Sequence, residues 1–181
     1  DAAAVGIVEK VIGFLFLVPS SMLSTVSALG AQNIGAGKPE RAVQTLWYAM
    51  AIAAGFGLIV SLLMQRFAEP VVGLFTSDKA AIAAGGPYLR GYIWDCIFAG
   101  IHFCFSGYFC AVGKSGLSFL HNIVAIVLVR IPGALLTSRM FPDTLLPMGL
   151  ATACGSLVSV LICLLAFSLL RKKEREKPIR E

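Results

Sequence analysis

Five long stretches of this chain carry almost no charge, and they decide what it can fold into. Residues 11–37, 42–65, 96–113 and 144–170 contain no Asp, Glu, Lys or Arg, and 115–138 contains only Arg130. A helix that crosses the hydrocarbon layer of a bilayer needs about 20 mostly apolar residues. With flanking residues, the sequence predicts transmembrane helices at about 3–33, 42–67, 87–112, 115–140 and 145–171. The expected fold is therefore an all-α polytopic membrane protein.

The composition excludes several other classes of protein. Apolar residues make up 57% of the chain and charged residues 14%, whereas soluble domains carry roughly 25% charged residues. A disordered chain, a nucleic-acid-binding protein and a soluble enzyme all need more polar surface than this. The five cysteines lie in apolar stretches without the spacing of metal ligands, and no H-E-x-x-H pattern occurs. We therefore expect no catalytic residues, no metal site and no nucleic-acid partner.

The basic residues predict the orientation of the chain in the membrane. The connections at 34–41 and 113–114 and the residues from 171 onward fall on one side and hold nine Lys and Arg, against four on the other side. Basic residues are enriched in cytoplasmic loops. We therefore expect a multi-pass protein of the plasma membrane with a cytoplasmic tail and with Asp1 outside. Because the first residue is not Met, the chain is also expected to be a fragment that lacks at least one upstream helix.

Four ionisable residues lie within the predicted spans, where facing lipid would cost each roughly 2.5–3.5 kcal/mol on insertion scales. They are Glu9, Lys10, Asp95 and Arg130, and all lie about 10–15 Å from the outer end of their helices at 1.5 Å per residue. This common depth allows Arg130 to pair with Asp95 or with Glu9. Asp95 and Glu9 are candidates for binding a coupling cation, although Glu9 and Lys10 could also simply belong to the outer interface.

Polar side chains form one stripe on the predicted helix 87–112. At 100° per residue, a face about 80° wide holds five of them: Tyr88, Tyr92, Asp95, His102 and Ser106. With Arg130 they are candidates to line a polar pathway through the membrane. The alternative is that they form interhelical hydrogen bonds and an ion pair that only hold the helices together.

A proline within the first predicted span indicates a kink. Pro19 has no N–H to donate to the carbonyl of Leu15. Ser20, Ser24 and Ala28 follow at spacings that permit close contact between helices. Kinked helices with small residues are typical of transporters that bend between states, and they also occur in static bundles.

The most specific segment is Leu29–Arg41, LGAQNIGAGKPER. It resembles the Q-N-x-G-A-G-x-x-x-R signature of the multidrug and toxic compound extrusion (MATE) family. The matching positions are Gln32, Asn33, Gly35, Gly37 and Arg41. In the family this signature ends a helix and forms the cytoplasmic turn that follows, which agrees with the side predicted from the basic residues.

Three further segments resemble family motifs. Tyr88-Leu89-Arg90 opens a later helix, Gly107 with 113–115 resembles the G-x-x-x-x-x-G-[KD]-[ST] turn, and Arg130-Ile131-Pro132 resembles R-[IV]-P. Family members have twelve helices in two six-helix lobes. The resemblance implies that residues 1–171 are part of the C-terminal lobe, as helices eight to twelve, followed by a basic cytoplasmic tail at 172–181. The seventh helix and the N-terminal lobe would then be missing.

The resemblance also implies a function. Family members export organic cations and other xenobiotics by antiport with Na⁺ or H⁺, through alternating access between the lobes. The expected partners are the lipid bilayer, small organic cations and the N-terminal lobe of the same chain; no cofactor besides the coupling ion is expected. The acid that some members carry on the tenth helix would fall near Ile101, six residues beyond Asp95, which leaves the ion open. The alternatives are a lipid-linked oligosaccharide flippase of the same superfamily, a membrane scaffold and a non-functional truncated fragment.

Overall fold

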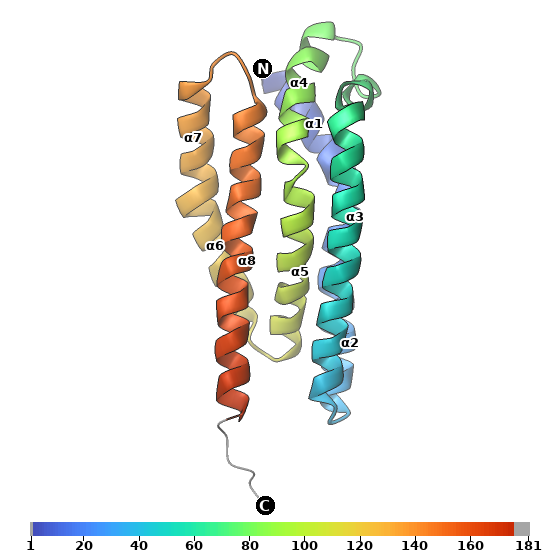
Figure 1. The fold of residues 1–181 in the computed structure, drawn as a ribbon, viewed down its shortest axis with the longest axis vertical. Coiled ribbons are helices and arrows are strands. Elements are labelled where there is room, and N and C mark those ends of the chain that lie inside the picture. The colour runs from blue at the N-terminus through green and yellow to red at the C-terminus, as the bar shows by residue number, and fades with distance from the viewer. Residues whose placement is uncertain (1, 176–181) are drawn as a thin grey trace, which may run out of the picture.

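The computed structural model describes residues 2–175, and helices account for nearly all of them (Figure 1). No strand occurs in this range, which confirms the predicted all-α fold. The helices are α1 (Ala2–Leu15), α2 (Leu17–Gly35), α3 (Pro39–Gly73), α4 (Lys79–Tyr92), α5 (Asp95–Ala111), α6 (Ser115–Ala125), the π-helical segment η1 (Ile126–Arg130), α7 (Ile131–Met140) and α8 (Leu146–Arg175).

Three of the predicted spans are continuous and two are bent. Helix α3, the run from α6 to α7, and α8 are each long and apolar enough to cross a membrane. The kink predicted within the span at 3–33 is confirmed, because α1 and α2 meet at 43°; a second bend, which was not predicted, lies within the span expected at 87–112, where α4 and α5 meet at 45°. If each bent pair crosses once, the chain makes five crossings.

Each bend has a physical reason. The first lies at Phe16, one turn before Pro19, where the carbonyl of Leu15 loses its usual N–H donor. The second lies at Ile93–Trp94, where the two halves of the span differ in part of their packing. Both pack on α3 and α8, but α4 also packs on α1, whereas α5 also packs on α2.

Several helix ends differ from the sequence expectation. The connection expected at 69–86 is only 74–78, because α3 runs to Gly73 and α4 starts at Lys79. Asp78 fixes this start, since its carboxylate accepts a hydrogen bond from the Ala80 amide at 2.9 Å. At the other end, α8 continues to Arg175, beyond the predicted boundary at 171. Residues 176–181 of the predicted tail, and Asp1, lie outside the described range.

Two glycine turns of the same type join helices at the end of the bundle where α8 ends. Gly37 and Gly113 have φ of +71° and +70°. After each glycine, the backbone N–H of a lysine donates to the backbone carbonyl five residues earlier. Lys38 donates to Asn33 at 2.8 Å, and Lys114 donates to Phe109 at 2.7 Å. This is the Schellman arrangement, which favours glycine in the left-handed position.

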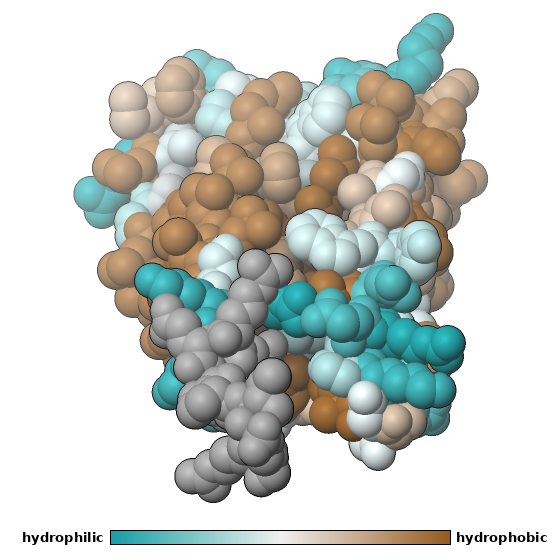
Figure 2. Space-filling view, turned by 60° about the horizontal axis from the view of Figure 1, so that its bottom comes forward, coloured by the Kyte–Doolittle hydropathy of each residue, from teal (hydrophilic) through white to brown (hydrophobic). Residues whose placement is uncertain are grey.

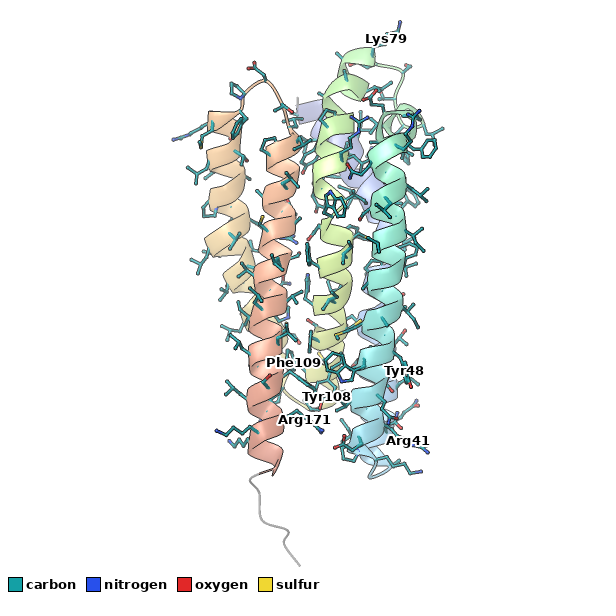
Figure 3. All side chains as sticks on the ribbon, in the orientation of Figure 1. Arg41, Tyr48, Lys79, Tyr108, Phe109 and Arg171 are labelled. Carbon is teal, nitrogen blue, oxygen red and sulfur yellow. The ribbon has the colours of Figure 1, made fainter. Side chains whose placement is uncertain are left out.

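These turns and the last turn of α8 lie at one end of the bundle, as the alternation of spans predicts (Figure 1). In Figure 2, viewed toward this end, hydrophilic residues gather there while hydrophobic residues dominate the sides. Arg41 and Arg171 lie at this end and Lys79 lies at the opposite one (Figure 3). An ion pair between Arg171 and Glu40, at 3.0 Å, joins the end of α8 to the start of α3.

Helix α5 runs through the middle of the bundle, and glycines bring it close to its neighbours. A Cβ on Gly107 would lie 2.5 Å from the Leu23 carbonyl oxygen of α2, and one on Gly57 of α3 would lie 2.9 Å from the backbone of Ile97. Buried side chains of α5, including Phe105, pack between α2, α3 and α8. The interior of the bundle is therefore organised around α5, the helix that carries Asp95.

Candidate functional site

An ion pair lies inside the helix bundle where α5 begins. Nη2 of Arg130 lies 3.0 Å from Oδ2 of Asp95, and it also donates to the Ser156 hydroxyl oxygen at 2.6 Å. The Asp95 side chain is 1% exposed, and that of Arg130 is 29% exposed. The common depth of the two residues allowed this pair, and the structure forms it. A buried carboxylate is costly without such a partner; Arg130 is that partner, and Ser156 holds its guanidinium in place.

The backbone around Arg130 positions its side chain. Arg130 is the last residue of η1, where the Ile131 amide bonds the Ile126 carbonyl five residues back. A π-helical turn holds an extra residue and changes which side chains face the neighbouring helices; such turns are frequent at functional sites. On α8, Gly155 lies against the Arg130 side chain and leaves room for it.

Glu9 pairs with a tyrosine and not with Arg130. The Tyr88 hydroxyl donates to Oε1 of Glu9 at 3.0 Å, so the alternative Glu9–Arg130 pair is wrong. The bend between α1 and α2, together with α4, brings Glu9 beside Tyr88. The Tyr88 ring meets Tyr92 edge-on, with centroids 5.7 Å apart, and Tyr92 in turn meets Phe16. Both tyrosines of the predicted stripe therefore lie between Glu9 and Asp95.

The two histidines form a second polar cluster further along α5. His121 of α6 is buried, with Nε2 at 2.8 Å from the Ser106 hydroxyl and Nδ1 at 2.5 Å from the Ser159 hydroxyl. The His102 ring lies 5.5 Å from the His121 ring, measured between centroids. Nδ1 of His102 is buried and has no hydrogen-bond partner among residues 2–175.

The structure thus brings the predicted polar-pathway residues together in two clusters. It also adds three residues to these clusters that sequence reasoning missed. The polar stripe indicated His102 and Ser106, but not the partners His121, Ser156 and Ser159. Ser156 and Ser159 stand three residues apart in the charge-free part of α8, and this spacing was a signal that could have found them. His121 had no such pattern around it.

The residues of the turn motif lie apart from both clusters. The carbonyls of Gln32 and Asn33 accept the amides of Ala36 and Lys38 at 3.0 and 2.8 Å. Gly37 supplies the left-handed conformation of this turn. Gly35 and Arg41 are exposed around it. In this structure the motif builds the connection between α2 and α3 and contributes nothing to the Asp95 pair.

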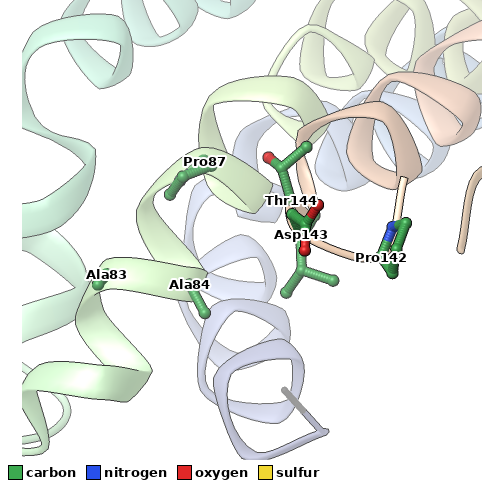
Figure 4. Close-up of a pocket in the computed structure, with 7 residues that line it drawn as sticks. Ala83, Ala84, Pro87, Pro142, Asp143 and Thr144 are labelled. Carbon is green, nitrogen blue, oxygen red and sulfur yellow. The ribbon is translucent and has the colours of Figure 1, made fainter.

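Three pockets lie elsewhere on the lobe. One of about 60 Å³ lies between α4 and the loop before α8 and is lined by residues that include Pro87, Asp143 and Thr144 (Figure 4). Two shallow grooves of about 340 and 330 Å³ have mostly apolar linings; one lies between α7 and α8, and the other lies beside Lys10 and Phe14. None of these three is lined by Asp95 or the polar stripe.

Comparisons with known proteins give one family and two relatives. A family model described as MatE matches residues 1–136. The chain is 28% identical over 160 residues to a protein named FAD transporter from Shewanella oneidensis, covering 82% of this chain and 35% of that protein. It is 30% identical over 73 residues to "Uncharacterized 21 kDa protein in iaaL 5'region" of Pseudomonas savastanoi, covering 40% of this chain and 24% of that protein. No solved structure matches. The chain spans about a third of the length of the FAD transporter.

Proposed function

Because the chain belongs to the MatE family, a family of membrane transporters, we propose that it is part of a secondary transporter that exports organic cations or other xenobiotics in exchange for Na⁺ or H⁺. In this proposal residues 1–171 belong to the C-terminal lobe, the tail lies in the cytoplasm, and the protein resides in the plasma membrane. The N-terminal lobe of the full-length protein completes the alternating-access unit. The observation that carries the proposal is the buried Asp95–Arg130 pair.

The pair supplies a mechanism for exchange. A carboxylate within the membrane needs a positive partner, and Arg130 provides one from inside the protein. A coupling cation that reaches Asp95 takes over this role and releases the guanidinium, which keeps its bond to Ser156. Asp95 therefore alternates between an internal and an external cation. The two arrangements differ in the position of Arg130, which gives the ion a differential affinity for the two states.

The bent spans connect this local change to a movement of the lobe. Asp95 is the first residue of α5, immediately after the bend at Ile93–Trp94. Both halves pack on α8, which also carries Ser156, and on α3, while the α4 half also packs on α1 and the α5 half also packs on α2. A shift of Arg130 relative to Asp95 therefore acts at the junction of two differently anchored segments.

A second candidate substrate follows from the relative named FAD transporter. A flavin dinucleotide carries a pyrophosphate, as a lipid-linked oligosaccharide also does, and this group favours arginine and lysine partners. In the spans of this chain Arg130 and Lys10 offer that charge. Lys10 is exposed on α1, beside the aromatic ring of Phe14. The anionic substrate would use these residues from the surface facing the rest of the protein.

The test is transport by the full-length protein in proteoliposomes, with an imposed pH or Na⁺ gradient. Ethidium serves as the cationic probe and FAD as the anionic one. The variant Asp95→Asn is expected to abolish gradient-driven ethidium efflux, while Asp143→Asn, in the exposed loop between α7 and α8, leaves it unchanged.

Each other result has a definite meaning. Unchanged efflux by Asp95→Asn would contradict the coupling role of Asp95. Transport of FAD without transport of ethidium would favour the dinucleotide. If neither gradient moves either probe, the antiport proposal fails and the scaffold or truncated-fragment alternative takes its place.

A further inference from the structure

A polar cluster that the exchange at Asp95 does not use lies between this site and the end of the lobe that carries the tail. Its members Ser106 and His121 are buried, and Ser106 is eleven residues beyond Asp95 on α5, which is about 16 Å at 1.5 Å per residue. We propose that His121 passes protons between the Asp95 site and the tail-side surface, so that the coupling ion is H⁺. This inference rests on the proposed antiport and names its ion.

The geometry around His121 is that of a proton shuttle. Its two ring nitrogens each lie within hydrogen-bond distance of one hydroxyl, Ser106 on one side and Ser159 on the other. A neutral imidazole has one N–H donor and one acceptor nitrogen. It can take a proton at the acceptor nitrogen and release the other proton from the opposite nitrogen. One proton enters, one leaves, and the ring ends as the other neutral tautomer without a stored charge.

On the tail side, the cluster reaches toward the surface. The Ser118 hydroxyl donates to the Ser106 carbonyl at 3.1 Å, and it lies 3.9 Å from the thiol of Cys110. Ser118 is partly exposed and Cys110 is exposed, close to the turn at Gly113. The Ser118 hydroxyl bonds the backbone carbonyl of Ser106, so it marks the tail-side approach to the cluster and is not itself a step of the shuttle.

On the other side, His102 connects the cluster toward the ion pair. Its ring centroid is 5.5 Å from that of His121, and Arg130 is the charged residue that acts on it electrostatically. His102 is 4% exposed, and its Nδ1 lacks a hydrogen-bond partner within the described range. An unpaired buried nitrogen costs free energy, and the interhelical hydrogen bonds of the cluster leave this one unpaired. In the proposed relay it is the atom available to accept a proton between the ion pair and His121.

The donor set of the cluster favours a proton over Na⁺. The groups that face His121 are the hydroxyls of α5 and α8 and the His102 ring, and those that act on His102 are His121 and Arg130. No carboxylate appears among these groups. Hard cations are bound by several carboxylate or carbonyl oxygens, whereas imidazole and hydroxyl groups relay protons.

The test uses the full-length transporter in proteoliposomes with ethidium as the probe. His121→Gln keeps an amide donor and an acceptor in place of the ring but cannot exchange protons in this way. We expect it to lower pH-gradient-driven ethidium efflux, and proton release on adding ethidium, by at least roughly tenfold, because a positioned proton-transfer group contributes 10²–10⁴-fold in other proteins. Ethidium binding and thermal melting in detergent stay as in the unmodified protein.

Two further measurements separate a relay from a structural role. The efflux rate of the unmodified protein is expected to fall in D₂O, and this dependence is lost in His121→Gln. Ser106→Ala and Ser159→Ala each interrupt one end of the shuttle and lower efflux even if His121→Gln does not fold. Ser168→Ala is the matched control on α8, since that exposed hydroxyl bonds only its own helix at Leu164.

The outcomes distinguish this inference from the proposed function. Normal pH-driven efflux by His121→Gln and by both serine variants overturns the relay, while loss of efflux in Asp95→Asn still supports the antiport. Efflux driven by a Na⁺ gradient alone at constant pH also overturns the relay and leaves the antiport standing. If no gradient drives the unmodified protein, the antiport fails, and the relay fails with it.

Discussion

Gly155 of α8 lies directly against the side chain of Arg130. A Cβ added at Gly155 would come within 2.5 Å of Cγ and 3.1 Å of Nε of that arginine. The next residue, Ser156, accepts a hydrogen bond from the same guanidinium. Helix α8 thus offers Arg130 an open position followed by a polar partner. The guanidinium can therefore point toward Asp95 because residue 155 is a glycine, which leaves space for the arginine side chain, and because the two groups carry opposite charges.

The first prediction concerns this open position. Gly155→Ala is expected to displace Arg130 and to lower gradient-driven transport by roughly tenfold or more, since small misplacements of a functional group can cost up to about 100-fold. Overpacking also destabilises the fold by about 1–3 kcal/mol. Gly13→Ala on α1 is the control, because its Cβ would have no neighbour within 4 Å. Equal transport by the two variants in proteoliposomes would show that Arg130 does not need this space.

The second prediction concerns the ion pair itself. Arg130→Met leaves Asp95 buried without a partner and is expected to lower the free energy of unfolding by about 3–5 kcal/mol. The double variant Asp95→Asn with Arg130→Met removes the buried charge and recovers most of this loss. Thermal or denaturant unfolding in detergent measures both.

The pair between Arg90 and Glu69 provides the matched control for this cycle. It has a similar distance, 3.1 Å, but its acid is 48% exposed. Exposed pairs contribute about 0–1 kcal/mol, so the same double-variant cycle there should show little coupling. Equal coupling energies for the two pairs would mean that burial of Asp95 is energetically unimportant.

The third prediction concerns the contact between α4 and α8. A Cβ on Gly149 would come within 2.5 Å of backbone atoms of Tyr88 and Tyr92, and one on Gly91 would collide with the Leu146 carbonyl oxygen. Backbone atoms cannot rotate away, so Gly149→Ala is expected to separate the helices and destabilise the protein by about 1–3 kcal/mol. Gly55→Ala, which meets nothing within 4 Å, should be neutral or slightly stabilising. Melting temperatures in detergent compare the two, and similar values would contradict the tight contact.

The fourth prediction concerns the two glycine turns. Gly37→Ala and Gly113→Ala force a residue with a Cβ into φ near +70°, which is expected to cost about 1–2 kcal/mol each. Gly35→Ala, two residues before the first turn and without a positive φ, serves as the control. Unfolding measurements should rank the two turn variants below the control. A control variant as unstable as Gly37→Ala would show that backbone conformation is not the cause.

Much of the fold could be predicted because the bilayer imposes simple rules. Charge-free stretches gave the spans from Ser115 to Met140 and from Leu146 onward almost to the residue. The Gly-Lys pairs marked both turns, since glycine is the residue that the left-handed position favours. The bend near Pro19 followed from a missing N–H. The second bend could not be predicted in the same way, because it reflects which helices the two halves of the span contact.

The candidate site was only half determined by the sequence. The common depth of Asp95, Arg130 and Glu9 limited the pairs to two, and depth alone could not choose between them. Two features of the packing decide which acid pairs with Arg130. Helix α4 places the Tyr88 hydroxyl beside Glu9, and the π-helical segment places Arg130 opposite Asp95.

The sequence by itself predicted a membrane protein, the largest number of times that it can cross and the positions of its ionisable groups along the helices. These properties depend on hydropathy and on a rise of 1.5 Å per residue, which are local and additive. The tertiary structure alone decided that Asp95 bonds Arg130 and Ser156, and that His121 bridges Ser106 and Ser159. Those contacts depend on the rotation of each helix about its axis, which small changes such as a π-helical turn or a glycine contact set and which the hydrophobic pattern does not record.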